Sequence, residues 1–125
     1  MFDAIFKFGE KLKLSRHDLS CLDFFGKSFR EEDLRKPNFT NADFQNANLR
    51  RVFLKRAIFK NACLEKADLT RASLIEADLS GADLRGCSLE EAALRRTSLR
   101  NANLEGANLN FADALGADLT GAISD

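Results

Sequence analysis

The sequence predicts an all-β solenoid in which the chain turns by roughly a right angle after every fifth residue. From position 44 to position 119, sixteen positions recur at intervals of five, and fifteen of them hold Leu or Phe. Two residues before these positions, fourteen of the seventeen residues from 42 to 122 are Ala, and the exceptions are Val52, Cys87 and Thr97. The repeating unit is therefore A-(D/N)-L-x-x.

A period of five excludes the regular alternatives. In an α-helix, residues five apart differ by about 140°, so the leucines would spread around the helix. In a straight strand, residues five apart lie on opposite faces. A coil that closes after about four units, or about 20 residues, keeps every Leu and Ala inside, and successive coils stack about 4.8 Å apart. The polar residues between the hydrophobic ones supply the turns.

The run ADFQNANLRRVFLKRAIFKNACLEKADLTRASLIEADLSGADLRG resembles the pentapeptide-repeat proteins. The resemblance covers at least residues 37 to 122 and, more loosely, everything from about Leu14. It implies the fold of that family, a right-handed quadrilateral β-helix, here with about five coils. Its relatives of the Qnr and MfpA type are fluoroquinolone-resistance proteins that resemble DNA and bind type II topoisomerases, whereas most members have no assigned biochemistry.

The chain divides into two segments. Residues 1–13 lack the repeat and are expected to form a short cap, helical or irregular, over the first coil, because a bare solenoid end exposes strand edges. A membrane-binding amphipathic segment is the alternative for these residues. Residues 14–125 are expected to form the β-helix, since Leu or Phe holds the same phase from Leu14 to Phe39 without a break.

Composition and motif content limit the kinds of function that the chain can have. The 125 residues make one domain, and 19 basic residues balance 19 acidic ones, so no general attraction to nucleic acid or anionic lipid is implied. No apolar run reaches the roughly 18 residues that span a bilayer, and we expect a cytoplasmic protein. Cys21, Cys63 and Cys87 are expected to be reduced thiols, with no metal and no cofactor. No catalytic motif is present, and we expect a protein that is not an enzyme.

If residues 20 apart stack in columns, the charges can be summed for each face. The faces of the Phe29 and Leu34 columns hold ten bases and seven acids, and those of the Leu19 and Phe24 columns, with Asp23, hold four bases and eight acids. Phe53 and Ile58 occupy outward positions that elsewhere hold polar residues, either as cover for a corner or as contact residues. The candidate interaction face consists of Arg50, Arg51, Phe53, Lys55, Arg56 and Ile58. Its alternative interpretation is a solvated face that keeps the solenoid soluble.

The C-terminal stretch differs from the rest. Residues 101 to 125 hold four acids and no base, and Phe111 and Leu115 fall at outward phases. We expect a homodimer that joins two chains through this end, with Phe111 and Leu115 in the contact. The alternative is a monomer whose last residues fold across the opening.

Two functions follow from these observations. The first is a non-catalytic solenoid that acts as a rigid protein-interaction scaffold for an unknown partner. The second, implied by the resemblance, is a DNA mimic that binds type II topoisomerase. Mimicry needs a continuous negative surface, and here the charges are mixed.

Overall fold

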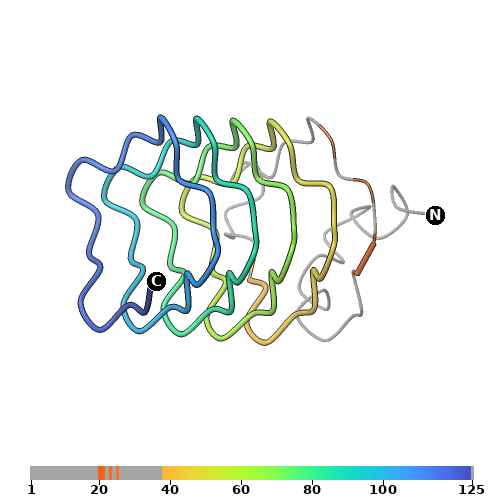
Figure 1. Ribbon diagram of the computed structural model, residues 1–125, viewed down its shortest axis with the longest axis horizontal. Coiled ribbons are helices and arrows are strands. Elements are labelled where there is room, and N and C mark those ends of the chain that lie inside the picture. Colours follow the sequence, from red (N-terminus) through yellow and green to blue (C-terminus); the bar gives the residue numbers. More distant parts are fainter. Residues whose placement is uncertain (1–19, 22, 24, 26–37, 125) are drawn as a thin grey trace.

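The computed structural model describes residues 20, 21, 23, 25 and 38–124. The predicted cap over residues 1–13 and the predicted start of the coil near Leu14 lie outside the described residues. Residues 38–124 wind into a solenoid whose coils lie side by side along the long axis of the molecule, with the C-terminus at one end (Figure 1). This described part contains no helix, and therefore none long and apolar enough to cross a membrane.

Single parallel β-bridges hold the coils together. Every bridge from Asn38↔Ile58 to Asn103↔Ile123 joins a residue to the one four pentapeptide units further on, so each coil takes four units, as the period predicted. The bridges form four columns, which define the four walls of the solenoid. We name them the Asp43 wall (Asp43, Cys63, Asp83, Asn103, Ile123), the Asn48 wall (Asn48, Asp68, Ser88, Asn108), the Phe53 wall (Phe53, Ser73, Ala93, Asp113) and the Ile58 wall (Asn38, Ile58, Asp78, Ser98, Asp118).

Every corner between two walls has the same backbone turn. At one of them, the amide of Val52 donates to the carbonyl of Leu49 at 3.3 Å, and Arg51 between them has a φ of 59°. The corresponding residue of every turn from position 41 to position 121 has a positive φ. This hydrogen bond and a positive φ at the third residue are typical of type II β-turns, in which Gly and Asn are favoured.

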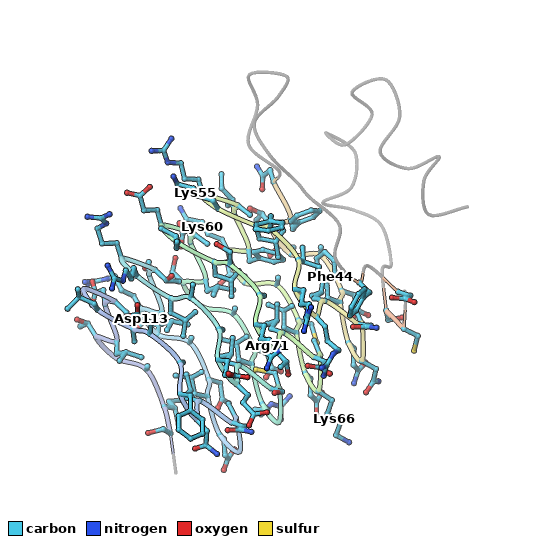
Figure 2. The ribbon with its side chains drawn as sticks, turned by 90° about the horizontal axis from the view of Figure 1, so that it is seen from above. Phe44, Lys55, Lys60, Lys66, Arg71 and Asp113 are labelled. Carbon is cyan, nitrogen blue, oxygen red and sulfur yellow. The ribbon has the colours of Figure 1, made fainter. Side chains whose placement is uncertain are left out.

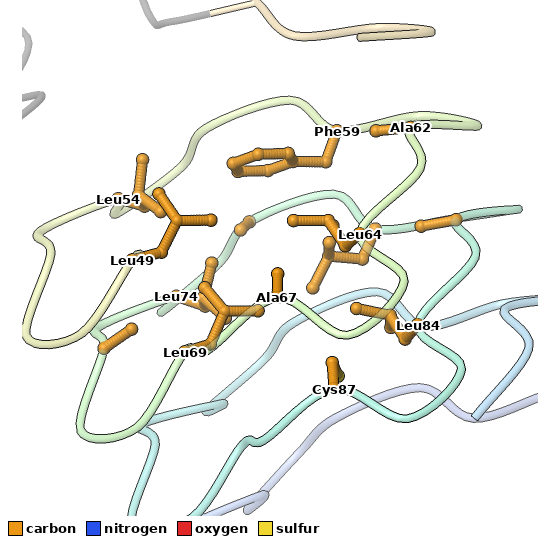
Figure 3. Close-up of a cluster of buried hydrophobic side chains, with 14 of the residues drawn as sticks. Leu49, Leu54, Phe59, Ala62, Leu64, Ala67, Leu69, Leu74, Leu84 and Cys87 are labelled. Atoms are coloured by element: carbon orange, nitrogen blue, oxygen red, sulfur yellow. The ribbon is translucent and has the colours of Figure 1, made fainter. Parts of the chain in front are cut away.

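The interior is filled by the repeating Leu, Phe and Ala side chains, which point inward from consecutive walls (Figure 3). Leu49, Leu54 and Leu69 are fully buried. Each buried leucine contributes about 1.5–3 kcal/mol to stability through the hydrophobic effect. Thr97, which replaces an Ala, is also buried, and its hydroxyl donates to the carbonyl of Leu74 at 2.7 Å. The axis therefore holds no space for a ligand along the coils that these residues line.

The register before residue 38 differs from the prediction. Asp23 bridges to Asn48, which lies one pentapeptide unit beyond the regular spacing, and the amide of Cys21 donates to the carbonyl of Gln45. Asp23 thus belongs to the Asn48 wall and not to the column of Asp43, so the unbroken phase predicted from Leu14 to Phe39 is wrong as a guide to stacking. The sequence of the interval gives a physical reason, because Lys27 and Glu32 stand where Ala should be and an unpaired charge cannot lie on a dry axis.

The C-terminal end of the core is exposed in this structure. Leu89 and Leu99 are 0% and 1% exposed, whereas Leu109 and Leu119, which occupy the same repeat positions one coil later, are 37% and 48% exposed. The last coil has no coil beyond it among the described residues. The end of the solenoid is consequently apolar.

Candidate interaction surfaces

Most mid-wall side chains cap the turn that follows them. Asp43 accepts a hydrogen bond from the amide of Gln45 at 2.9 Å, and Asn48 accepts one from the amide of Arg50 at 3.1 Å. The same bond forms at Asp68, Asp78, Asp83, Ser88, Asn103, Asn108, Asp113 and Asp118. These polar groups are thus committed to the backbone and are not free to recognise a partner by themselves.

Three successive coils of the Phe53 wall differ, although its last member, Asp113, caps its turn. Phe53, Ser73 and Ala93 follow one another along its middle, and none of them forms this capping bond with the described backbone. The Phe53 side chain is 50% exposed. Ile58, on the neighbouring wall, is half-buried. Phe53 is therefore the more accessible of the two apolar residues that the sequence singled out.

The predicted interaction face extends over two corners. Arg50 and Arg51 lie at the corner between the Asn48 and Phe53 walls, and Lys55 and Arg56 lie at the opposite corner of the Phe53 wall. Arg50 contacts Asp68 at 3.1 Å and Arg56 contacts Glu76 at 2.9 Å. Arg51 and Lys55 are exposed and form no ion pair within the part of the chain that the structure describes.

Ion pairs connect neighbouring coils along the outside. The arginine of one coil contacts the acid of the next in the pairs Arg50–Asp68, Arg56–Glu76, Arg71–Glu91, Arg95–Asp113 and Arg100–Asp118. Hydrogen bonds lower the pKa of Asp118 to about 2, with the largest contribution from Thr120 and a smaller one from Arg100. The hydrogen bond from Arg56 lowers the pKa of Glu76 in the same way. Burial acts to raise the pKa of Asp68, but hydrogen bonds from Thr70 and Arg50 outweigh it and lower the pKa.

One basic corner extends beyond the predicted interaction face, which included Lys55 and Arg56 but not Arg95 and Arg96. Between the Phe53 and Ile58 walls, four bases stand against a single acid, Glu76, which contacts Arg56 at 2.9 Å and Arg96 at 3.6 Å. We call this corner the basic ridge. It consists of Lys55, Arg56, Ile75, Glu76, Arg95, Arg96, Leu115 and Gly116. The signal was present as the recurrence of a pair of bases at positions 55 and 56 and again at positions 95 and 96. Figure 2 shows Lys55 projecting from the body of the solenoid.

Within the described residues, the bridge from Asp23 to Asn48 reduces the charge contrast between the two pairs of faces. Once Asp23 moves to the Asn48 wall, the described residues of the Asn48 and Phe53 columns hold seven bases and six acids. The other two columns hold four bases and six acids. Among the described corners, the basic ridge has the largest net charge.

One group of side chains has the composition of a metal site. A ligand atom of Cys63, one of Glu65 and one of Asp83 lie within 4.8 Å of one another. The Arg85 guanidinium, however, contacts Asp83 at 2.6 Å and Glu65 at 3.7 Å, and it lowers the pKa of Asp83. The positive charge that these carboxylates require is therefore supplied by Arg85. Cys87, in contrast, is buried, and burial raises the pKa of its thiol to about 12, so it is a core residue and not a nucleophile.

The residues predicted at the dimer contact lie at the exposed end of the solenoid. Phe111 is 86% exposed and Leu115 is 66% exposed. Leu115 also lines a shallow hollow of about 250 Å³ together with Arg95, Arg96 and Gly116. Leu115 is thus shared between the basic ridge and the apolar end.

Known proteins show which family has this architecture. The sequence pattern of the family described as pentapeptide repeats matches in eight copies, over residues 38–74, 54–90 and 87–123. The chain belongs to the pentapeptide-repeat family. No curated protein matches it.

Solved pentapeptide-repeat structures have the same fold. Rfr23 from the cyanobacterium Cyanothece 51142 is 29% identical, with a TM-score of 0.81 over 86% of this chain and 84% of that one. HetL from Nostoc sp. strain PCC 7120, a protein involved in heterocyst differentiation regulation, is 34% identical, with a TM-score of 0.84 over 86% of this chain and 48% of HetL. This pentapeptide-repeat chain thus spans about half the length of HetL.

Proposed function

We propose that this pentapeptide-repeat protein is a rigid scaffold that binds another protein through its outer walls and catalyses no reaction. The observation that supports this most is the filled axis, in which Leu, Phe and Ala side chains are buried from coil to coil. Binding sites for small substrates are normally concave and pre-formed. Here the groups that another molecule can reach lie on flat walls and corners.

The Phe53 wall is the wall best suited to a partner. It presents a half-exposed aromatic ring, Phe53, between two cations without ion pairs in the described structure, Arg51 and Lys55. Aromatic and arginine side chains are the residues that contribute most often to binding energy at protein interfaces. We propose this wall as the docking surface.

Affinity capture from the source organism tests the scaffold role. The wild-type chain should retain a specific protein, and the double variant Arg51→Glu, Lys55→Glu should lose it. The control is Lys66→Glu, which reverses another exposed cation without an ion pair in the described part of the chain, at a different corner. A failure of the wild type to retain any protein beyond those held by an unrelated pentapeptide solenoid would contradict the proposal.

DNA mimicry is the weaker alternative. A mimic of DNA must present continuous negative charge, because its partner is built to neutralise phosphates. The described surface instead alternates bases and acids in ion pairs, and the basic ridge has the largest net charge of the described corners. We expect the protein to leave DNA supercoiling by gyrase unchanged, and inhibition at stoichiometric amounts would reverse this assignment.

We also propose that two copies of the 125-residue chain pair through their last coils. The outer edge of that coil carries amide donors at Leu109 and Leu119 and carbonyl acceptors at Ala107 and Ala117, none with a hydrogen bond in the described structure. An acceptor followed two residues later by a donor is the pattern that two antiparallel strands exchange, so the edge is complementary to itself. The exposed Leu and Phe side chains of the same coil would be buried in the contact.

Sedimentation tests the dimer. At high micromolar concentration the wild-type chain should sediment as a dimer, and the double variant Phe111→Ser, Leu119→Glu should sediment as a monomer. A wild-type monomer at that concentration would refute the pairing.

We propose that the protein resides in the cytoplasm. The support is chemical, since Cys21, Cys63 and Cys87 are all free thiols, one exposed, one half-buried and one buried. Thiols persist in reducing compartments. Fractionation of the source cells with an antibody to the chain would test this localisation, and recovery in an oxidising compartment would contradict it.

A further inference from the structure

The basic ridge combines charge with an apolar centre. Along it, Lys55 and Arg56 occupy one coil and Arg95 and Arg96 occupy the coil two steps later. Between these two pairs of bases lies Ile75, which is half-buried and stacks in the same column as Lys55. The ridge therefore presents two cationic clusters that are separated by an apolar side chain.

The far end of the ridge is hollowed. Gly116 has no side chain to cover Arg96, and a Cβ placed there would lie 3.2 Å from the Cγ of Arg96. The resulting depression of about 250 Å³ is bounded on its apolar side by Leu115, which is 66% exposed. A partner side chain can enter there without displacing the ridge.

The spacing of the ridge matches one type of secondary structure. Coils stack about 4.8 Å apart, so the two cationic clusters lie about 9.6 Å apart. Residues seven apart in an α-helix lie on one face and are separated by about 10.5 Å, with the residues three and four positions along lying midway. Residues on one face of an extended strand repeat at intervals of about 6.6 Å and would miss one cluster.

The charge distribution favours a protein over a nucleic acid. Glu76 lies in the middle of the ridge, between Arg56 and Arg96, and Asp113 contacts Arg95 at its side. A continuous line of phosphates would be repelled by Glu76 at that point. Two separate carboxylates that flank an apolar side chain would lie away from Glu76 and escape this repulsion.

We propose that the basic ridge binds an acidic amphipathic helix of a partner protein, in which two carboxylates lie seven residues apart and an apolar side chain lies midway. The two carboxylates pair with the clusters at Lys55 and at Arg95, and the apolar side chain packs on Ile75. The inference deepens the proposed scaffold role, on which it rests.

Fluorescence anisotropy with a labelled, alanine-rich helical peptide tests the geometry. The matched peptide carries two glutamates seven residues apart with a leucine midway, and its isomer has the same composition with the glutamates on opposite faces. The matched peptide should bind the wild-type chain about tenfold more tightly than the isomer. A labelled single-stranded oligonucleotide of similar length should bind more weakly than the matched peptide.

The chain offers a closely matched control for the surface. The double variant Lys55→Glu, Arg95→Glu should weaken binding of the matched peptide by about tenfold, whereas Lys66→Glu, Arg100→Glu should leave it within about twofold. Arg95 and Arg100 are equivalent, because each contacts an acid of the next coil, at 2.7 Å and 2.9 Å, and each side chain is 53% exposed. Both variants change the net charge equally, so a general electrostatic attraction would affect them alike.

Circular dichroism of each variant establishes that the solenoid is folded. Equal binding of the two peptides, equal losses in the two variants, or preferential binding of the oligonucleotide would each overturn the inference. A partner that is captured through the Phe53 wall while the matched peptide fails to bind would refute the helix geometry and leave the scaffold role standing.

Discussion

Individual residues at the corners carry a conformational cost. Side chains with a Cβ are disfavoured at positive φ by about 1–2 kcal/mol, yet Arg51, Lys66 and Phe111 all adopt it. The repeat accommodates this because the turn bond and the filled axis determine the backbone at every corner. Nine of the seventeen corner residues from 41 to 121 are nevertheless Gly or Asn, which tolerate this conformation best.

Two glycines at equivalent corners allow the cost of backbone strain to be measured apart from the cost of a steric clash. Gly81 and Gly86 have φ values of 70° and 66°, so Ala is strained at both. At Gly86 a new Cβ meets only the Cγ of Lys66 at 3.4 Å, and we expect Gly86→Ala to lower the free energy of unfolding by about 1 kcal/mol. At Gly81 the Cβ would lie 2.1 Å from the side-chain oxygen of Asn61, so Gly81→Ala should cost more.

Urea unfolding measures both changes. The double variant Gly81→Ala, Asn61→Ala no longer has the clash, so the loss of unfolding free energy caused by Gly81→Ala in the Asn61→Ala background should equal the loss caused by Gly86→Ala in the wild type. Equal costs for the two single variants would contradict the packing shown at this corner.

A second residue-scale prediction concerns the core. Leu79→Ala should destabilise the chain by about 2–5 kcal/mol, because Leu79 is fully buried in the axis and its loss leaves a cavity. Leu109→Ala, at the same repeat position but 37% exposed, should cost clearly less for the isolated chain in thermal or chemical unfolding. A similar loss at both positions would show that the last coil is covered.

At the residue scale, the sequence predicted the inward residues well and the outward ones incompletely. The five-residue period alone placed Leu69 and Ala72 in the core, since burial follows from the winding of the backbone. It could not show that Arg50 is paired with Asp68 whereas Arg51 has no ion pair in the described structure, because that depends on side-chain reach between coils. Phe53 and Phe111 were recognised because an apolar residue breaks the polar pattern.

At the scale of the coil, each coil is joined to the next by backbone hydrogen bonds and by ion pairs. Exposed ion pairs each contribute only about 0–1 kcal/mol, and salt screens them. The capping bonds accepted by the same carboxylates, such as Asp68 and Asp118, give these acids a second function. One ionised group thus supports both the turn and the neighbouring coil.

These carboxylates make stability depend on pH. The pKa values of Asp68, Glu76, Asp83, Asp113 and Asp118 are all lowered in the folded chain. Because the unfolded carboxyls titrate near pH 4, the unfolded state binds more protons below that pH, so their contribution is present above about pH 4. It should be lost as the pH falls from about 4 toward 2, where Asp118 titrates.

Chemical unfolding at a series of pH values measures this loss. Asp118→Asn should be less stable than the wild type at neutral pH, and its stability should fall less steeply in acid. A wild-type stability that rises between about pH 4 and pH 2 would contradict the assignment.

The stacking of coils could be predicted only where the repeat is regular. From residue 38 onward the period of four pentapeptide units placed each wall correctly. Before it, Asp23 stacks on Asn48 and not on Asp43, and the sequence between them has Lys27 and Glu32 at the small-residue position, where an unpaired charge is disfavoured on a dry axis. The recurrence of Leu or Phe at every fifth residue does not by itself show how many pentapeptide units make up one coil.

At the scale of the whole molecule, the described solenoid is a rod with a charge gradient along its axis from residue 38 to residue 124. Residues 38–57 hold four bases and one acid, whereas residues 98–124 hold one base and three acids. The basic ridge begins at the first of these regions, and the proposed dimer contact lies at the second. A partner and a second copy can therefore bind at different places on one rod.

The central claim is that the chain closes one coil with every four pentapeptide units, and disulfide trapping tests it most directly. In a background of Cys21→Ser, Cys63→Ser and Cys87→Ala, the pair Ser73→Cys and Ala93→Cys should cross-link readily. These positions bridge on one wall, and adjacent strands hold Cα atoms about 4.8 Å apart, within the range of a disulfide. The pair Ser73→Cys and Ser88→Cys, on different walls, should stay reduced under the same oxidant. Equal cross-linking of the two pairs, or none at positions 73 and 93, would contradict the coil and every surface derived from it.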